Sequence, residues 1–407
     1  MSGAAVGGEA RTPSLWRQPA FLRLFVPSVG VGLQQQMVVI ALPLLVYQVS
    51  ASHLQMNVVR ALNYVPYLFL AFVIGALVDQ SDKKRWLVGA AGLQSVSLVA
   101  LAVLFGIGGG GSPLVYALVL ALSVANYTYF NARSSAIKIA LRPGDLGPAA
   151  AAFTSIGQAF QMLGPALAGV LLLFPSSSTA LWAAAGVALV SLAALVSLDL
   201  DPGPAPAAEP LGARIAEGWR ALRANRPMWH FTLVIMVTNC IETTIGITIL
   251  QKAQALGLSP AGIGLLFSAG GGVGMAGSLL APRLRPVLGL GRLAALSVAV
   301  TALATLAASQ AGSAFTLGVA LATSSFSIMV YSVLVSTLRQ ESTPVAVIGR
   351  VTGVTGSLYQ LGAPAAVIGA GLLGEASGVG AVLLCTAAAG LFMAAVIMAD
   401  PVLRRLR

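Results

Sequence analysis

Twelve long apolar stretches follow one another along the chain, and short polar segments separate them. Each stretch has roughly the 20 residues that a helix needs to cross the hydrocarbon core of a membrane. They lack the polar–apolar alternation of membrane β-barrel strands, and irregular backbone cannot face lipid. The pattern therefore predicts an all-α membrane protein. We place its helices at 24–47, 57–78, 86–107, 114–132, 150–174, 179–198, 229–250, 261–281, 293–308, 314–335, 351–373 and 379–398.

The composition agrees with a membrane location. Hydrophobic residues make up 57% of the 407 positions, charged residues only 9%, and the mean hydropathy is +0.89. A soluble protein carries about 25% charged residues. A cytosolic enzyme, a disordered chain and a nucleic-acid-binding protein are therefore excluded, and we expect no nucleic-acid partner despite the net charge of +11.

The positive charges orient the helices. If both termini are cytoplasmic, all but two of the 23 lysines and arginines fall on the cytoplasmic side, and the exceptions are Arg60 and Lys252. Cytoplasmic loops are normally the ones enriched in Lys and Arg. We therefore expect a multi-pass protein of a bacterial-type inner (plasma) membrane with both ends inside, where its cations attract anionic lipids.

The chain carries signs of an internal duplication. Gly75–Asp79 (GALVD) is followed at a nearly constant offset by Gly277–Ala281 (GSLLA), and Gly164-Pro165 by Ala363-Pro364. Two related halves are typical of transporters in which one half rocks against the other. We expect a six-helix bundle in residues 1–199, a cytoplasmic linker in 200–227 and a second six-helix bundle in 228–407.

The predicted linker has two parts. Its first part is rich in proline and should be extended. Its second part has an apolar helical face, which predicts an amphipathic helix lying on the inner membrane surface. A plain solvated linker helix remains the alternative. The face consists of Leu211, Ile215, Trp219 and Leu222.

The loop between the second and third predicted helices carries a family resemblance. GALVDQSDKKR (Gly75 to Arg85) resembles the signature G-x-L-x-D-R-x-G-R-R of the major facilitator superfamily, and it occupies the family's position in the chain. IALPLLVYQ and GPALAG are most similar to the branch of enterobactin exporters and macrolide efflux pumps. Gln80 and Asp82 depart from the signature. The resemblance implies alternating-access transport, often proton-coupled efflux.

The resemblance also suggests a conformational latch in this loop. It consists of Gly75, Asp79, Lys83, Lys84 and Arg85. A carboxylate at a helix end can accept hydrogen bonds from the amino end of a neighbouring helix, which in the family is the eleventh. We expect Asp79 to hold the cytoplasmic side shut in the outward-open state. The alternative is that the cations only set the topology.

Glu242 is the one acidic residue well inside an apolar stretch. Counted from the cytoplasmic end of its helix it lies ~20 Å into the bilayer. An acid there is usually paired, protonated or exposed to water, and it marks a functional site by default. We interpret Glu242 as the proton-coupling residue. The alternative is a structural carboxyl group paired with Arg60 or bonded to Asn239.

Polar and aromatic residues inside other stretches suggest a substrate cavity. Three consecutive glutamines at 34–36 point about 100° apart, so at most two can face one cavity. These side chains also suit hydrogen bonds between helices, which stays an alternative for each. As a set they favour a large amphiphilic solute. The candidates are Gln35, Gln36, Asn126, Asn239, Tyr331, Tyr359 and Gln360, with Gly164 and Pro165 as a packing or kink site.

The residues offer little for other chemistry. The two histidines and two cysteines form no ligand or nucleophile spacing, and Gly272–Gly277 (GVGMAG) follows no strand, so we expect no enzyme activity, metal or cofactor. The preferred function is a monomeric secondary transporter that exports a drug- or siderophore-like small molecule against protons. An importer, a lysophospholipid flippase and a non-transporting membrane sensor remain alternatives.

Overall fold

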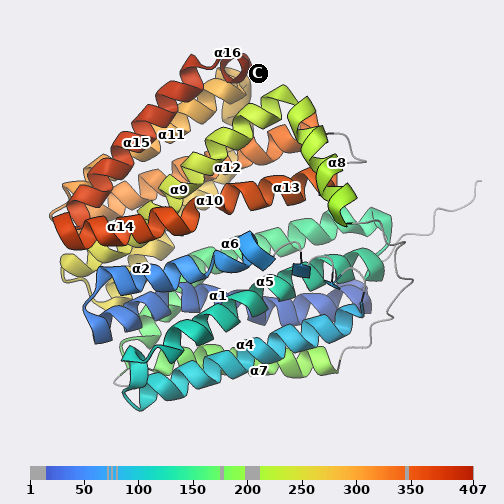
Figure 1. Cartoon of the computed structure of the whole chain (residues 1–407), viewed down its shortest axis with the longest axis vertical. Coiled ribbons are helices and arrows are strands. Elements are labelled where there is room, and N and C mark those ends of the chain that lie inside the picture. The colour runs from blue at the N-terminus through green and yellow to red at the C-terminus, as the bar shows by residue number, and fades with distance from the viewer. Residues whose placement is uncertain are drawn as a thin grey trace, which may run out of the picture.

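The computed structural model describes residues 15–406 except 71–72, 75–76, 79–80, 175–177, 198–210 and 344–347. This part of the chain is helical and holds no strand, which confirms the predicted all-α class (Figure 1). The first group of helices consists of α1 (Pro19–Ser50), α2 (His53–Leu62), the π-helical turn η2 (Pro66–Leu70), α4 (Lys83–Gly106), α5 (Leu114–Ala140), α6 (Leu146–Leu171) and α7 (Thr179–Val196).

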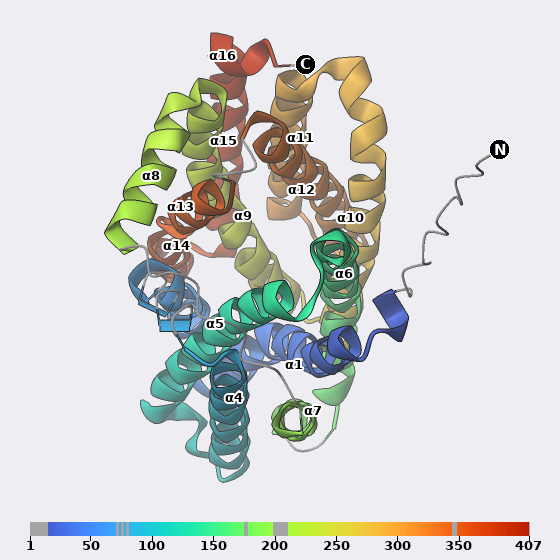
Figure 2. The ribbon, with the colours of Figure 1, turned by 90° about the vertical axis from the view of Figure 1, so that its right-hand side faces the viewer.

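A second group follows the short helix α8 (Leu211–Ala224). It consists of α9 (Arg226–Ala255), α10 (Pro260–Leu288), α11 (Leu290–Ser309), α12 (Ala314–Ser342), α13 (Ile348–Gln360), α14 (Ala363–Ser377), α15 (Val379–Ala399) and α16 (Pro401–Arg404). Single 3-10 turns at Leu15–Arg17, Gly109–Gly111 and Pro143–Asp145 complete the order. The two groups lie side by side in Figures 1 and 2.

Short polar side chains begin several of these helices. The side chains of Ser52, Asp82, Asn225, Ser259 and Ser313 each accept a backbone N–H from the first turn of the following helix. These bonds satisfy donors that a helix leaves free at its start. The polar residues between the apolar stretches therefore fix where the helices begin.

Ten helical segments of the described chain are long and apolar enough to cross a membrane, with α13 and α14 counted as one. The predicted second and fifth stretches are occupied by α2 with η2 and by α6. Large apolar side chains face outward: Phe315 is 79% exposed, Val287 78% and Val190 71%. Such a surface suits lipid and not water. The arrangement is consistent with twelve spans.

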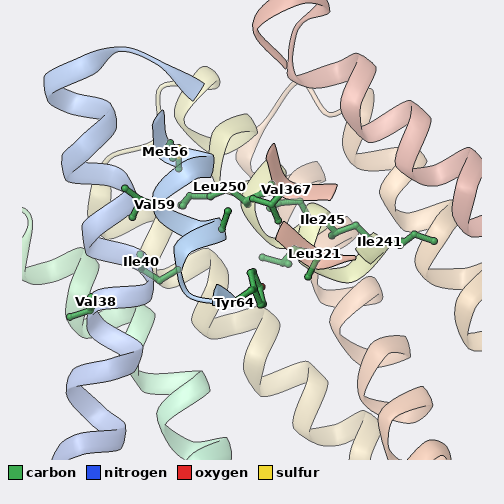
Figure 3. Close-up of a cluster of buried hydrophobic side chains, with 14 of the residues drawn as sticks. Val38, Ile40, Met56, Val59, Tyr64, Ile241, Ile245, Leu250, Leu321 and Val367 are labelled. Atoms are coloured by element: carbon green, nitrogen blue, oxygen red, sulfur yellow. The ribbon is translucent and has the colours of Figure 1, made fainter. Parts of the chain in front are cut away.

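The two groups touch mainly at one end of the molecule. There α2 packs against α14, and α6 packs against α10 (Figures 1 and 2). Apolar side chains from α1, α2, α9, α12 and α14 meet in one core cluster at this contact, including Met56, Val59, Leu250 and Val367 (Figure 3). We call this end the α2–α14 end. The opposite end, where α8 lies in Figure 1, is the α8 end.

Two of the predicted helices are broken, which the apolar pattern did not reveal. The second ends at Leu62 and resumes as η2 from Pro66, whose ring leaves no N–H and clashes with the carbonyl four residues earlier. The eleventh was predicted as one helix over 351–373, but it divides at Leu361-Gly362 just before Pro364. Both breaks bring irregular backbone into the middle of the bundle, where it must be buried in protein or line a cavity.

The helix predicted in the linker is present as α8. Leu222 is fully buried against Met228, Val351 and Val354, and Glu217 forms an ion pair with Arg350. The apolar face therefore contacts α9 and α13 at Leu222 instead of lipid. For the residues of the apolar face of α8 that are more exposed than Leu222, contact with the membrane stays a prediction. The proline-rich part of the predicted linker lies outside the described residues.

The predicted latch is only partly visible. Gly75 and Asp79 lie outside the described residues. Asp82 caps α4 by accepting the backbone N–H of Lys84 at 2.8 Å, and Arg85 lies 3.5 Å from the same carboxylate. The Lys83 amine is buried and donates to the carbonyls of Val78 at 2.6 Å and Ser81 at 2.8 Å. The cations thus order the loop, and the latch itself stays a prediction.

Candidate functional site

A cavity of about 550 Å³ lies between the two groups of helices. Amide, hydroxyl and tyrosine side chains share its wall with apolar ones. Ile40, Tyr64 and Leu250 belong both to this wall and to the core cluster of the α2–α14 end (Figure 3). The lining residues are Gln35, Gln36, Val39, Ile40, Arg60, Asn63, Tyr64, Tyr67, Ser123, Asn126, Tyr127, Gln161, Pro165, Gly246, Ile247, Leu250, Phe267 and Gln360.

The three consecutive glutamines of α1 divide between the cavity and the protein interior. Gln35 and Gln36 line the cavity. Gln34 is fully buried and donates to Gln94 Oε1 at 3.5 Å, and Gln94 in turn donates to Asn126 Oδ1 at 2.9 Å. This chain of amides orients Asn126, which lines the cavity from α5. The angular spacing of a helix explains why only two of the three face the cavity.

The break between α13 and α14 supplies another part of the wall. The Tyr359 carbonyl, in the last turn of α13, accepts Asn239 Nδ2 at 2.7 Å. The same Asn239 amide donates to Gln360 Oε1 at 2.9 Å. A carbonyl in the last turn of a helix has no partner within that helix, and the Asn239 amide supplies one here. Asn239 therefore holds Gln360, which lines the cavity, without lining it itself.

The tyrosines predicted for the cavity are not among its lining residues. Tyr331 is buried within the second group, where its ring stacks on Phe231 at 6.2 Å and its hydroxyl accepts from Thr238 at 3.2 Å. Tyr359 is half-buried beside the helix break. Both side chains pack within their own group of helices, so a substrate-binding role for them stays a prediction.

Glu242 lies on α9 one helical turn before Gly246, a lining residue of the cavity. Its side chain is half-buried and lies close enough to Tyr331 for an electrostatic interaction. Among the residues that the structure describes, it has neither a hydrogen-bond partner nor an ion-pair partner. The Arg60 pair considered from the sequence is not formed here: Arg60 lines the cavity, whereas Glu242 does not. Nor does Glu242 bond to Asn239, whose amide is engaged by the helix break.

Several cavity residues escaped the sequence analysis. They are polar residues in the broken second helix and in the fourth and fifth helices. A search for every polar side chain inside the predicted spans would have found them, but nothing in the sequence says which of these side chains face one space. The missed residues are Asn63, Tyr64, Tyr67, Ser123 and Gln161.

Polar bonds join the two groups at the α2–α14 end. Asn57 is fully buried, donates to the Val367 carbonyl at 2.8 Å and accepts Gln251 Nε2 at 2.7 Å. Near the end of α14, the Glu375 carboxylate accepts the Ser52 hydroxyl and the Leu54 backbone N–H. These bonds connect α2 to α14 and α9 and seal the cavity from this end.

Glycines allow the second contact between the groups. A Cβ atom added to Gly264 of α10 would overlap the Pro165 carbonyl of α6 and lie 3.1 Å from the Cα atom of Gly169. One added to Gly169 would overlap the Pro260 carbonyl. Gly164 likewise packs against the backbone of Gln36. Pro165 lies inside α6 without ending it, so the structure gives the Gly164-Pro165 pair a close-packing geometry.

Asn57→Ala is expected to shift the protein toward states that are open at the α2–α14 end. Alanine leaves the buried Gln251 amide without its acceptor and removes the donor to the Val367 carbonyl, a loss that costs about 1–3 kcal/mol and arises only while the seal is closed. The distance between spin labels on the exposed residues Ala51 and Ala376 should report a several-fold larger separated population. Gln310→Ala, which removes an exposed amide, is the control, and an unchanged distance distribution in Asn57→Ala would contradict the seal.

A bundle of membrane-crossing helices in two groups, sealed at one end around a polar cavity, defines a membrane transporter. The family model described as Major Facilitator Superfamily matches residues 24–367. The chain therefore belongs to the major facilitator superfamily, as its signature loop predicted. The transporter class and the fold are both confirmed.

Curated relatives are efflux pumps. The chain is 27% identical over 275 residues to "Multidrug efflux pump Tap" of Mycobacterium tuberculosis, and the match spans 65% of each protein. The chain thus covers less than two thirds of that relative's length. It is 25% identical over 412 residues to the pump of the same name from Mycolicibacterium fortuitum, with 96% of this chain and 97% of the relative covered.

Solved structures share the fold. The nucleoside transporter NupG superposes with a TM-score of 0.73 at 14% identity, covering 96% of this chain and all of that one. A bacterial homologue of the iron transporter ferroportin, in an inward-facing state, gives a TM-score of 0.68 at 18% identity, with 95% and 99% covered. At these identities the likeness concerns the fold alone.

Proposed function

We propose that this protein exports small amphiphilic molecules across a bacterial inner membrane in exchange for protons. The observation that carries the proposal is a polar cavity between two groups of helices that meet at one end, with a half-buried carboxyl group one helical turn from a lining residue. The names of the relatives, multidrug efflux pumps, support export over import. Alternating access then requires that the seal at the α2–α14 end open while the α8 end closes.

The distribution of cations supports a cytoplasmic α8 end. On the predicted topology both termini and α8 are inside, so the closed α2–α14 end faces outward. The structure is then an inward-facing state, ready to load solute from the cytoplasm. The latch of Gly75, Asp79, Lys83, Lys84 and Arg85 would act in the opposite state, when the α8 end closes.

Glu242 suits the coupling step for a physical reason. A charged carboxylate inside the membrane is costly, on the order of 3 kcal/mol, unless water or a cation accompanies it. A group without a hydrogen-bond or ion-pair partner in the described chain can gain and lose a proton as access changes. Proton binding from outside and release inside would then drive solute outward. Tyr331, its neighbour, is the polar group through which this change would reach α12, another helix of the same group.

The cavity wall supports an amphiphilic solute. Side-chain amides from Gln35, Gln36, Asn126 and Gln360 offer both donors and acceptors, and the tyrosines and aliphatic residues offer apolar area. A solute with one polar and one apolar part matches this wall better than a small ion does. Interaction with anionic lipids is supported by exposed arginines at 292, 404 and 405, near the end of the second group. We expect the monomer to be sufficient.

Transport by the purified chain in sealed vesicles with an imposed pH gradient tests the proposal. A panel of siderophores, macrolides and lysophospholipids should be followed in both directions. Gradient-dependent movement of an amphiphilic solute out of the side that carries α8 is expected, and dissipating the gradient should stop it. Uptake in the opposite direction would favour an importer, movement of lysophospholipids alone would favour a flippase, and no movement of any solute would favour a sensor.

A further inference from the structure

Arg60 is the only charged residue among the described residues that line the cavity. It lies in the last turn of α2, just before the break that Pro66 causes. Its side chain is half-buried, and within the described part of the chain its guanidinium has no ion pair or hydrogen bond. Its backbone carbonyl accepts the Asn63 backbone N–H at 3.3 Å and Asn63 Nδ2 at 3.4 Å.

None of the described acids pairs with this cation. The described acids that form ion pairs or side-chain bonds use other partners: Asp82 with Arg85, Asp145 with Gln18, Glu217 with Arg350, Glu341 with Arg285, Glu375 with Ser52 and Asp400 with His230. Glu242, which has no such partner, is not a lining residue of the cavity. Within the described part of the chain, the cavity wall therefore carries one positive charge and no acid that pairs with it.

A guanidinium group in this position has a preferred ligand. It presents a planar fork of N–H donors that matches the two oxygens of a carboxylate. In this half-buried position, an oxyanion that binds there gains charge-assisted hydrogen bonds and supplies the counter-charge of the guanidinium. Neutral solutes would leave that charge without compensation.

Aromatic rings lie in the same wall. Tyr67 and Tyr127 meet edge to face with ring centroids 4.7 Å apart, and Tyr64 also lines the cavity. Aromatic side chains of this kind pack well against planar rings of a ligand. Asn63, whose Oδ1 accepts the Ser123 hydroxyl at 3.1 Å, adds a polar group to the same wall.

We propose that the cavity selects solutes that combine a carboxylate with an aromatic body, with the carboxylate held by Arg60. The proposal rests on the proposed function, because it takes this cavity as the transport site. It adds the chemical class of the solute and names the residue that recognises it.

Paired dyes test this selectivity. We would measure binding of a rhodamine with a free carboxylate, and of the methyl ester of the same dye, to the full chain in lipid nanodiscs by fluorescence anisotropy. The unmodified protein should bind the acid roughly tenfold or more tightly than the ester, the effect of a charge-assisted pair. Arg60→Gln should remove that preference by weakening the acid alone, and Arg60→Lys should keep part of it.

The ester and a second cation serve as controls. Unchanged ester binding shows that Arg60→Gln remains folded, and Lys252→Gln, whose amine contacts the Ser309 carbonyl at 3.2 Å, should leave both dyes unaffected. An equal loss for both dyes in Arg60→Gln would overturn the proposal and favour a structural role or a pair with Glu242. Absence of binding, or no preference in the unmodified protein, would overturn it as well.

A transport measurement separates this inference from the proposed function. The same two dyes are followed in vesicles with an imposed pH gradient. Acid-selective binding without movement of either dye would leave the carboxylate site standing and contradict export. Gradient-driven movement of both dyes at equal rates, without selective binding, would support export and contradict the carboxylate site.

Discussion

Replacing Glu242 by glutamine is expected to reduce pH-gradient-driven transport to the level of protein-free vesicles. Glutamine keeps the size and a hydrogen-bonding head of the side chain but cannot exchange a proton, so the gradient no longer acts on the protein. Because Glu242 does not line the cavity, solute binding should persist. Transport is measured in vesicles with an acidic interior or exterior, and binding by fluorescence with the same preparation.

The matched control for this variant is Glu341→Gln. Glu341 is exposed and forms a two-pronged ion pair with Arg285, with both N–O distances at or below 2.7 Å. Exposed ion pairs contribute about 0–1 kcal/mol, so this variant should transport normally. If Glu242→Gln still followed the pH gradient, Glu242 would be a structural carboxyl group and the coupling site would lie elsewhere.

Gly264→Val is expected to open the α2–α14 end. The new side chain would overlap the Pro165 carbonyl, so α6 and α10 must separate. Overpacking of this kind costs about 1–3 kcal/mol, and only the state sealed at this end bears that cost. Ten-fold changes in the ratio of the two states correspond to about 1.4 kcal/mol. The distance distribution between spin labels on Ala51 and Ala376 should therefore shift strongly toward larger distances. Transport should also become slower.

Gly186→Ala is the control for that variant. Gly186 lies in α7, and an added Cβ atom there meets no atom within 4 Å. The change should leave both the label distances and transport unaltered. Gly169→Val, which would overlap the Pro260 carbonyl from the other side of the same contact, should reproduce the effect of Gly264→Val. A normal distance distribution in both valine variants would mean that this contact does not hold the seal.

The sequence predicted the fold well because its signals are local. Apolar length identified the membrane helices, ten of which meet the criterion for crossing in the described chain. The signature loop identified the superfamily, which the family model matches over residues 24–367. The breaks at Pro66 and before Pro364 were missed, since proline is common in membrane helices and often leaves them continuous, as Pro165 does in α6.

The candidate site was predicted only in part. Gln35, Gln36, Asn126 and Gln360 meet at one cavity, whereas Asn239 supports its wall from behind the helix break. Arg60 was considered only as a partner for Glu242, yet it is the one charged residue among the described residues that line the cavity. The direction in which each side chain points depends on how its helix is rotated against others, and the polarity of a residue does not encode that rotation.

The sequence by itself therefore determined the membrane helices, the distribution of the cations and the position of one acid deep in an apolar stretch. The tertiary structure alone decided which distant residues act together. Asn57 meets Gln251 across 194 positions, and Gly264 meets Pro165 through backbone contact that no pattern records. The physical reason is that helix formation follows local hydrogen bonds and apolar length, whereas the seal and the cavity arise from packing between helices far apart in the chain.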